Sequence, residues 1–200
     1  MKKISLASAV AAALIGFAAP AQAVLVATGL SCNANNVMVT GFAPDALACS
    51  GAWVGNDSNQ QADVLAQLAI DFASIVGPTA TYTVICKSDE LVTNGPFTSN
   101  PSGSAGTLTF DTAQTGFFAI TLKASNEFST YLFDGGVTGL TSIDFSTAGV
   151  AVNQQGRAQG LSHATLIDIT TPVPEPETYA LMLAGLGAVG FMAKRRRKVA

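Results

Sequence analysis

The chain has 200 residues, of which 48% are hydrophobic and 12% are charged, and its formal net charge is −3. Basic residues concentrate at the two ends, so the stretch 24–171 contains three basic and eleven acidic side chains, a net charge of −8 with the single histidine neutral. Because an acidic surface repels phosphate backbones, this charge balance excludes nucleic acid as an expected partner.

The N-terminus has the three parts of a secretory signal peptide. Lys2 and Lys3 form a basic start, residues 4–19 form an apolar core, and Ala21-Gln22-Ala23 supplies an Ala-x-Ala cleavage site. We therefore expect residues 1–23 to direct export through the Sec translocon and the mature chain to begin at residue 24. Export would place the cysteines in an oxidising compartment, where disulfides persist.

Three cysteines leave one thiol over in any pairing. Short loop closure favours a disulfide between Cys32 and Cys49 over the other two pairings. Cys86 lies at the end of the β-branched run 82–86, which predicts a buried strand residue. No Cys-x-x-Cys motif occurs and one histidine cannot complete a zinc site with scattered cysteines, so we expect no zinc.

The first elements of the domain are short and extended. We expect an initial strand after residue 24, an asparagine-rich turn over 32–36 and a second strand at 37–40. Residues 41–48 have the composition of a loop. A glycine-rich stretch over 49–58 follows and leads to a helical pattern.

One amphipathic helix is expected over residues 59–76. Ser58 and Gln61 have the spacing of a capping box, and Gly77-Pro78 supplies a helix stop. Between these signals apolar residues recur at helical spacing, namely Ala62, Leu65, Leu68, Ala69, Phe72, Ile75 and Val76. This apolar stripe predicts that the helix packs on one face of a sheet.

After residue 79 the apolar pattern changes to a period of two. Phe118, Ile120 and Leu122 fall on one face of such a segment and alternate with smaller or polar residues. Strands are predicted at 81–87, 107–110, 117–123, 131–133, 142–145 and 164–169, with Gly- and Asn-rich turns between them. The fold class is therefore mainly β: an antiparallel β-sandwich or jelly roll with one amphipathic helix.

His163 is the residue that a catalytic interpretation would need. A Ser-His-Asp arrangement requires a nucleophilic serine and an orienting carboxylate, and no Gly-x-Ser-x-Gly motif is present. Because His163 precedes an apolar strand, we expect a histidine at a strand edge. The sequence therefore predicts a protein that is not an enzyme.

An alternative is a calcium site at Asp57, Asn59 and Asp63, whose oxygens are the ligands that calcium prefers. Their spacing does not match an EF-hand, because no glycine follows Gln61 and position twelve is Leu68. Turn and helix-cap chemistry explains these side chains more simply. We expect no bound cofactor and keep calcium as the alternative.

Carbohydrate chemistry gives two further alternatives. Three aromatic side chains could form a platform for sugars, although such residues usually fill cores: Trp53, Tyr82 and Tyr131. Two carboxylates from a set of four could act as the acid and base of a glycosidase if the fold brings them together: Asp57, Asp111, Asp134 and Asp144.

The C-terminal tail has three parts in a fixed order. The segment Val173, Pro174, Glu175 and Pro176 is expected to be extended, because proline fixes φ and lacks an amide donor. The uncharged apolar run 179–193 is expected to enter a bilayer as a transmembrane helix. A basic cluster then stops transfer and holds the end in the cytoplasm: Lys194, Arg195, Arg196, Arg197 and Lys198.

This tail resembles the sorting signal of the PEP-CTERM family of bacterial exported proteins, through residues 173–181, 183–187 and 195–197. The resemblance implies recognition by an exosortase, a transpeptidase-like membrane enzyme that cuts at or near Pro-Glu-Pro. It also implies a Gram-negative, exopolysaccharide-producing source. The chain then divides into a signal peptide at 1–23, an ectodomain at 24–171 and a sorting signal at 172–200.

A weaker resemblance covers the domain itself. Segments such as 49–51, 55–57, 118–124 and 161–164 are similar to a pattern in the presumed all-β ectodomains of PEP-CTERM proteins. Together the two resemblances imply a non-enzymatic protein of the cell surface or extracellular matrix, associated with exopolysaccharide or biofilm and held briefly in the inner membrane. The alternatives are a carbohydrate-binding or carbohydrate-active protein on a jelly-roll scaffold and a calcium-dependent adhesin.

Overall fold

A computed structural model describes residues 25–30, 32, 37–39, 46–90, 96–172 and 176–197. The expected signal peptide, with Ala21 and Ala23, lies outside the described residues. The same is true of Val173, Pro174, Glu175 and Lys198 in the tail.

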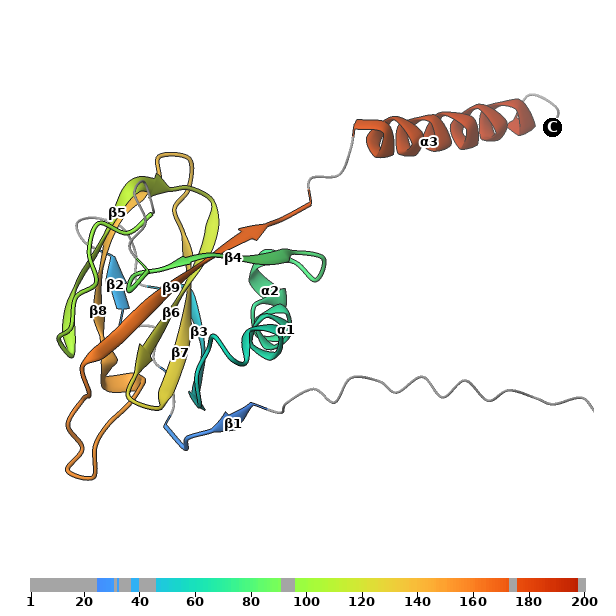
Figure 1. Cartoon of the computed structure of the whole chain (residues 1–200). Helices are drawn as coiled ribbons and strands as arrows, with labels where there is room; N and C mark the ends of the chain where they lie inside the picture. The colour runs from blue at the N-terminus through green and yellow to red at the C-terminus, as the bar shows by residue number, and fades with distance from the viewer. Residues whose placement is uncertain are drawn as a thin grey trace, which may run out of the picture.

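Two antiparallel sheets lie face to face (Figure 1). The larger has six strands in the order β1 (Val26–Ala27), β3 (Ala48–Val54), β7 (Glu127–Asp134), β6 (Phe117–Ala124), β9 (Leu161–Thr170) and β4 (Thr81–Lys87). The smaller has the order β2 (Val37–Val39), β8 (Leu140–Ser146) and β5 (Ala105–Gln114). The expected antiparallel sandwich is therefore present, but its six-plus-three division differs from the eight strands of a jelly roll.

The first core fills the space between the two sheets. Because successive side chains of a strand point to opposite faces, Phe118, Ile120 and Leu122 of β6 all enter this core, as their alternation predicted. The ring of Phe118 stacks on Phe133 of β7 at a centroid distance of 5.4 Å. Leu108 of β5 meets them from the smaller sheet. This core holds the sandwich together through apolar burial.

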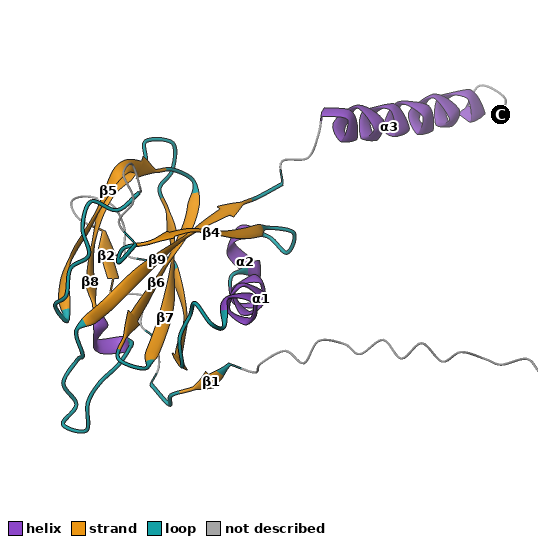
Figure 2. Cartoon of the chain, viewed as in Figure 1, coloured by secondary structure: helices purple, strands orange, loops and turns teal. Residues whose placement is uncertain are grey.

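The second core lies on the outer face of the larger sheet, under the helices α1 (Gln61–Asp71) and α2 (Ala73–Val76) (Figure 2). Their buried residues pack against Ala119, Leu132 and Ile167 of the sheet. The expected single helix over 59–76 is thus two segments, which meet at Phe72. This residue is fully buried, and its φ of −100° and ψ of −1° depart from regular helix values.

The expected capping box at the start of this helix is wrong. The residue before α1 is Gln60, and no side chain caps the helix there. The Ser58 N–H instead donates to Asn56 Oδ1 at 3.0 Å, an Asx turn that satisfies this amide locally and moves the helix start onward. The predicted stop is correct, because Gly77 follows α2 with a φ of +94°.

Strand β3 has no counterpart among the sequence predictions. Gly51 interrupts its apolar pattern, yet this glycine is what lets β3 approach β7. Its φ is +133°, and a Cβ atom added there would lie 2.7 Å from Ser129 Oγ. The residue that breaks the sequence pattern therefore makes the strand pairing possible.

A short 3-10 helix, η2 (Thr147–Gly149), follows β8. The buried hydroxyl of Thr147 donates to the backbone oxygen of Ser104 at 3.1 Å and also bonds to the backbone oxygen of Gln159. This contact fixes the long connection between β8 and β9 to the start of β5.

The tail forms helix α3 (Pro176–Arg197), which begins before the predicted residue 179 and ends after the predicted residue 193. Among the described residues, no helix is both long enough and apolar enough to cross a membrane. The expected transmembrane helix over 179–193 is corrected accordingly. Its apolar run has only fifteen residues and contains three glycines, and α3 extends beyond it into charged residues at both ends.

Candidate functional site: a buried carboxylate–histidine cluster

A row of hydroxyl side chains crosses the outer face of the larger sheet beneath α1. Ser50 of β3 is opposite Thr130 of β7, Thr130 is opposite Thr121 of β6, and Thr121 is opposite Thr165 of β9. All four are buried, and the hydroxyls of Thr121 and Thr130 share a hydrogen bond of 2.8 Å. The sheet thus presents a polar strip beside the apolar residues of the second core.

Two carboxylates, one near each end of helix α1, accept hydrogen bonds from the two ends of this row. At its C-terminal end Asp71 Oδ2 accepts a hydrogen bond of 2.6 Å from Ser50 Oγ. In the loop before its N-terminal end, Asp57 Oδ2 accepts one of 2.7 Å from Thr165 Oγ1. These bonds satisfy hydroxyls that burial would otherwise leave unpaired, and they set the position of the helix over the sheet.

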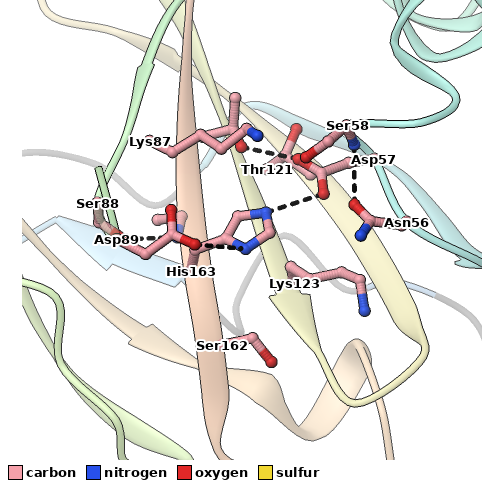
Figure 3. A network of polar contacts seen from close by, with 12 residues as sticks. Asn56, Asp57, Ser58, Lys87, Ser88, Asp89, Thr121, Lys123, Ser162 and His163 are labelled. Atoms are coloured by element: carbon pink, nitrogen blue, oxygen red, sulfur yellow. Dashed lines mark hydrogen bonds and ion pairs between the residues drawn. The ribbon is translucent and has the colours of Figure 1, made fainter.

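Asp57 also binds the single histidine of the chain (Figure 3). Its Oδ1 lies 2.9 Å from His163 Nε2, and both residues are buried, with exposed fractions of 5% and 7%. His163 is the third residue of β9, an interior strand between β6 and β4, so it lies inside a strand that begins earlier than the predicted residue 164. Asp57 lies in the turn before α1, as the sequence predicted, but its two side-chain oxygens bind His163 and Thr165 of the sheet rather than capping the helix.

A second carboxylate approaches the other ring nitrogen. Asp89 Oδ2 lies 3.5 Å from His163 Nδ1, and the Asp89 side chain is 44% exposed. Asp89 belongs to the segment that follows β4, so the imidazole connects the loop before α1 to the loop after β4 (Figure 3). A carboxylate oxygen therefore faces each of the two ring nitrogens of His163.

Backbone and amide contacts fix the Asp89 loop beside β9. Ser88 Oγ accepts a hydrogen bond of 2.7 Å from the Ala164 N–H and donates one of 2.7 Å to Asn100 Oδ1. Asn100 Nδ2 then donates to the backbone oxygen of Ser162 at 3.1 Å. The Ser88 hydroxyl therefore has its donor and an acceptor site occupied by structural partners.

Two lysines complete the polar surroundings. Lys123 of β6 is opposite His163 and is buried, and its Nζ donates to the backbone oxygen of Ser125. Burial lowers the pKa of Lys123, although the charges of Asp57 and Glu127 act in the opposite direction. Lys87 of β4 forms a surface ion pair of 3.5 Å with Glu90.

The ionisation of Asp57 follows from these contacts. Burial alone raises the pKa of its carboxyl group, because the charged form loses water. The hydrogen bond and charge of His163, the hydroxyl of Thr165 and the charge of Lys87 outweigh burial, and the pKa of Asp57 lies below its ordinary value. Asp57 is therefore held as a carboxylate in the folded protein.

This lowered pKa predicts a specific dependence of stability on pH. The stabilisation from Asp57 is fully present above its unfolded pKa, about 3.9, and is lost as the pH falls through the lower folded value. Urea unfolding of the wild type and of Asp57→Asn between pH 6 and pH 2 measures it. We expect the wild type to be more stable than Asp57→Asn at pH 6 and to lose this difference in unfolding free energy below about pH 4. A difference that stays constant from pH 6 to pH 2 would contradict a lowered pKa for Asp57.

The space beside the cluster is small. A cavity of about 10 Å³ lies against Asp57, Thr121 and Thr165 and is closed partly by Gln61 of α1. Such a volume holds about one water molecule and no sugar ring. The cluster is therefore a packed polar layer rather than a ligand cleft.

The structure does not gather the predicted calcium ligands. Asp57 faces His163 and Thr165, while Asn59 donates its N–H to the Asn56 backbone oxygen and Asp63 lies in the first turn of α1. Within the described part of the chain, no group of three or more His, Cys, Asp or Glu side chains is placed to hold a metal ion.

The four acidic residues considered for glycoside chemistry lie on separate elements. Asp57 is under α1, while Asp111 is on β5 of the smaller sheet. Asp134, at the end of β7, accepts a hydrogen bond of 2.7 Å from the Gly136 N–H, and Asp144 of β8 accepts one of 2.6 Å from Thr107 Oγ1. The carboxylates that do share a partner, Asp57 and Asp89, have an imidazole ring between them.

The three aromatic residues considered as a sugar platform are divided between the two faces of the larger sheet. Tyr131 is fully buried in the first core, between the sheets. Trp53 and Tyr82 pack against the second core, and Tyr82 donates its hydroxyl to the Leu68 backbone oxygen at 3.2 Å. They fill cores and form no common surface.

The disulfide that was predicted from short loop closure is present. Cys32 and Cys49 form a disulfide with a Cα–Cα distance of 6.1 Å. Cys86 is a free thiol on β4, half-buried against the first core.

The free thiol is expected to react slowly. Burial, together with the nearby charge of Glu90, raises the pKa of Cys86 to about 11, so little thiolate exists at pH 8. Labelling with a thiol-specific disulfide reagent at pH 8 is expected to be at least tenfold slower in the folded protein than in urea. Equal rates in the two conditions would show that Cys86 is accessible and ionised.

Comparison with known families finds one match, in the tail: residues 172–197 match the PEP-CTERM protein-sorting motif. No curated protein and no solved structure matches the chain. The matched segment begins two residues after β9 ends and includes all of α3. Such a motif implies export, transient membrane anchoring and processing by an exosortase. The chain is therefore an exported protein that carries a PEP-CTERM protein-sorting motif and is sorted by an exosortase.

Proposed function

We propose that the domain between the two ends is a non-enzymatic protein of the cell surface or extracellular matrix. The observation that supports this proposal is the sorting motif at 172–197. It is joined directly to a domain whose single histidine is buried, with a carboxylate facing each ring nitrogen. The motif delivers the domain outside the cell, and the cluster supplies packing rather than chemistry.

The geometry of His163 argues against catalysis. A general base needs a free ring nitrogen within reach of the proton that it removes. Both nitrogens of His163 face carboxylates, Asp57 at 2.9 Å and Asp89 at 3.5 Å, and the side chain is 9% exposed. The neighbouring Ser88 hydroxyl is engaged by Ala164 and Asn100 and is fully buried.

Processing is tested by the intact mass of the protein extracted from the cell surface. We expect the mature form to lack the basic tail from Lys194 to Lys198, because the cut falls at or near Pro174-Glu175-Pro176. A matched variant with Pro174→Ala and Pro176→Ala is expected to keep the tail. A wild-type surface form that retains the basic tail would contradict the proposal.

The partner in the matrix is tested separately. Binding of the processed protein to a glycan array, with and without calcium, compares exopolysaccharide association with a calcium-dependent adhesin. Binding to acidic or neutral glycans supports a matrix role, and binding that requires calcium supports the adhesin. Turnover of the bound glycans would replace the non-enzymatic proposal with a carbohydrate-active one.

A further inference from the structure

The sorting motif is attached to an interior strand of the folded domain. Strand β9 pairs with β6 on one side and β4 on the other, and its last ladder pair joins Thr170 to Thr81. The matched motif starts at residue 172, and α3 starts at Pro176. The strand that carries His163 therefore leads almost without a linker into the segment that is processed.

The reach of this connection is short. Five residues, 171–175, separate β9 from α3 and span at most about 18 Å when fully extended. A folded domain of about 150 residues has a radius of gyration of roughly 15 Å. An enzyme that acts on Pro-Glu-Pro must therefore contact the end of the sandwich at which β9 ends.

The strand registers define this end. Thr81 is opposite Thr170, and Phe117 is opposite Asp134, so the turn at 77–80 and the loop at 134–139 lie at the same end of the sheet. The N–H of Gly116 donates to the Gly136 oxygen and the N–H of Gly135 donates to the Gly116 oxygen, which joins the adjacent turns. We call residues 77–80, 115–117 and 134–139 the exit end; Figure 1 shows β9 leaving the sandwich past α2 and the start of β4.

The exit end has the chemistry of a protein contact rather than of a lipid contact. Val137 is 97% exposed in its loop, and Ile75 of α2, next to the turn at 77–80, is 39% exposed. The nearby charges are acidic, Asp134 and Asp168. Anionic lipid headgroups attract basic side chains, and an acidic end with exposed apolar residues does not suit them.

The basic residues of the domain lie toward the opposite end of the sheet. Lys123 is opposite His163, Lys87 is opposite Thr165, and Arg157 belongs to the loop that precedes β9. These three are all the basic residues between positions 24 and 171. The opposite end thus holds both signs of charge, because Asp57, Asp89, Glu90 and Glu127 lie near these bases, whereas the exit end has acidic residues and none of the basic residues of the domain.

We propose that the exit end is a docking surface for the exosortase and that the enzyme processes the chain while the domain is folded. This inference rests on processing at the sorting motif. In the folded domain the exit end lies beside the motif, because β9 is an interior strand and both of its ladders extend to within a few residues of the motif.

Two insertions of the same small folded domain test the docking surface in the full-length chain. The near insertion follows Pro78 in the exposed turn of the exit end, and the far insertion follows Gln155 in an exposed turn before β9. The two sites are separated by roughly the 33 Å length of the ten-residue strand β9. We expect the near insertion to lower the processed fraction at least tenfold and the far insertion to leave it unchanged.

A linker distinguishes a blocked contact from a misfolded domain. Twenty Gly/Ser residues inserted after Thr171 add a mean reach of about 25 Å and separate the motif from the exit end. In the otherwise wild-type chain they are expected to lower the processed fraction, and the near-insertion protein with the same linker is expected to rise to that lower level. Equal processing of the near and far insertions overturns the docking surface, and so does a linker that leaves processing of the otherwise wild-type chain unchanged. A wild-type chain that is not processed at all refutes the processing claim instead.

Discussion

Replacing Asp57 with alanine is expected to lower the free energy of unfolding by about 3–6 kcal/mol, because it removes a buried carboxylate that accepts two hydrogen bonds, each worth about 1.5–3 kcal/mol. The change leaves His163 Nε2 and Thr165 Oγ1 without the carboxylate that binds both. It also frees the loop before α1 from the sheet. Since domains of this size are stable by only about 5–15 kcal/mol, urea unfolding at pH 7 should show the loss clearly.

Two matched variants make this prediction specific. Asp63→Ala removes an aspartate from the first turn of α1, where its charge interacts favourably with the helix dipole, and is expected to change the unfolding free energy by less than about 1 kcal/mol. Asp89→Ala removes the longer, half-exposed contact to His163, also at a cost of about 1 kcal/mol or less. An Asp57→Ala protein as stable as these two would show that the cluster is not a stabilising unit.

A double-mutant cycle measures the coupling within the pair. His163→Ala combined with Asp57→Ala is expected to be less damaging than the sum of the single changes, because neither group is then left buried without its partner. Strict additivity would mean that the 2.9 Å contact contributes no net interaction energy.

Removing the disulfide is expected to have the second large effect. The bond between Cys32 and Cys49 closes a loop with a sequence separation of 17, for which loss of the cross-link costs about 3 kcal/mol. The bond ties the start of the chain to β3, next to the end strand β1 of the larger sheet. Thermal unfolding of the Cys32→Ser, Cys49→Ser protein measures the loss as a lower Tm.

The free cysteine supplies the control for this experiment. Cys86→Ser keeps the disulfide and replaces a half-buried thiol, so its Tm is expected to stay close to that of the wild type. A reducing agent should lower the Tm of the wild type and of Cys86→Ser but not that of the double variant. The prediction fails if reduction leaves the wild-type Tm unchanged.

Local sequence patterns predicted most of the regular structure because period and turn chemistry are local properties. The alternation over 117–123 correctly placed β6 and its inward face, and the run 81–87 matches β4 residue for residue. The helix near 59–76 was placed correctly, although its division at Phe72 depends on packing against the sheet. Strand β3 was not predicted, because Gly51 in its middle is typical of a turn.

The site could not be predicted from local sequence patterns. Asp57 and His163 are 106 residues apart, and they meet because β9 lies between β6 and β4 while α1 covers the same face. Asp57 stands in an Asn-Asp-Ser sequence, which indicates a turn when it is considered alone. The hydroxyl row depends on the relative register of four strands, which no single segment encodes. Only the sorting motif, a contiguous signal, was visible in full from the sequence.

The interior position of β9 also determines how the domain would bear a mechanical load. A protein held at its C-terminal end and pulled through its far loops transmits the force along β9. The hydrogen bonds to β6 and β4 then break by sliding, many at once, rather than one after another as when an edge strand is peeled away. In single-molecule pulling, this geometry is expected to give a higher unfolding force than pulling from β1, a two-residue strand at the edge of the sheet.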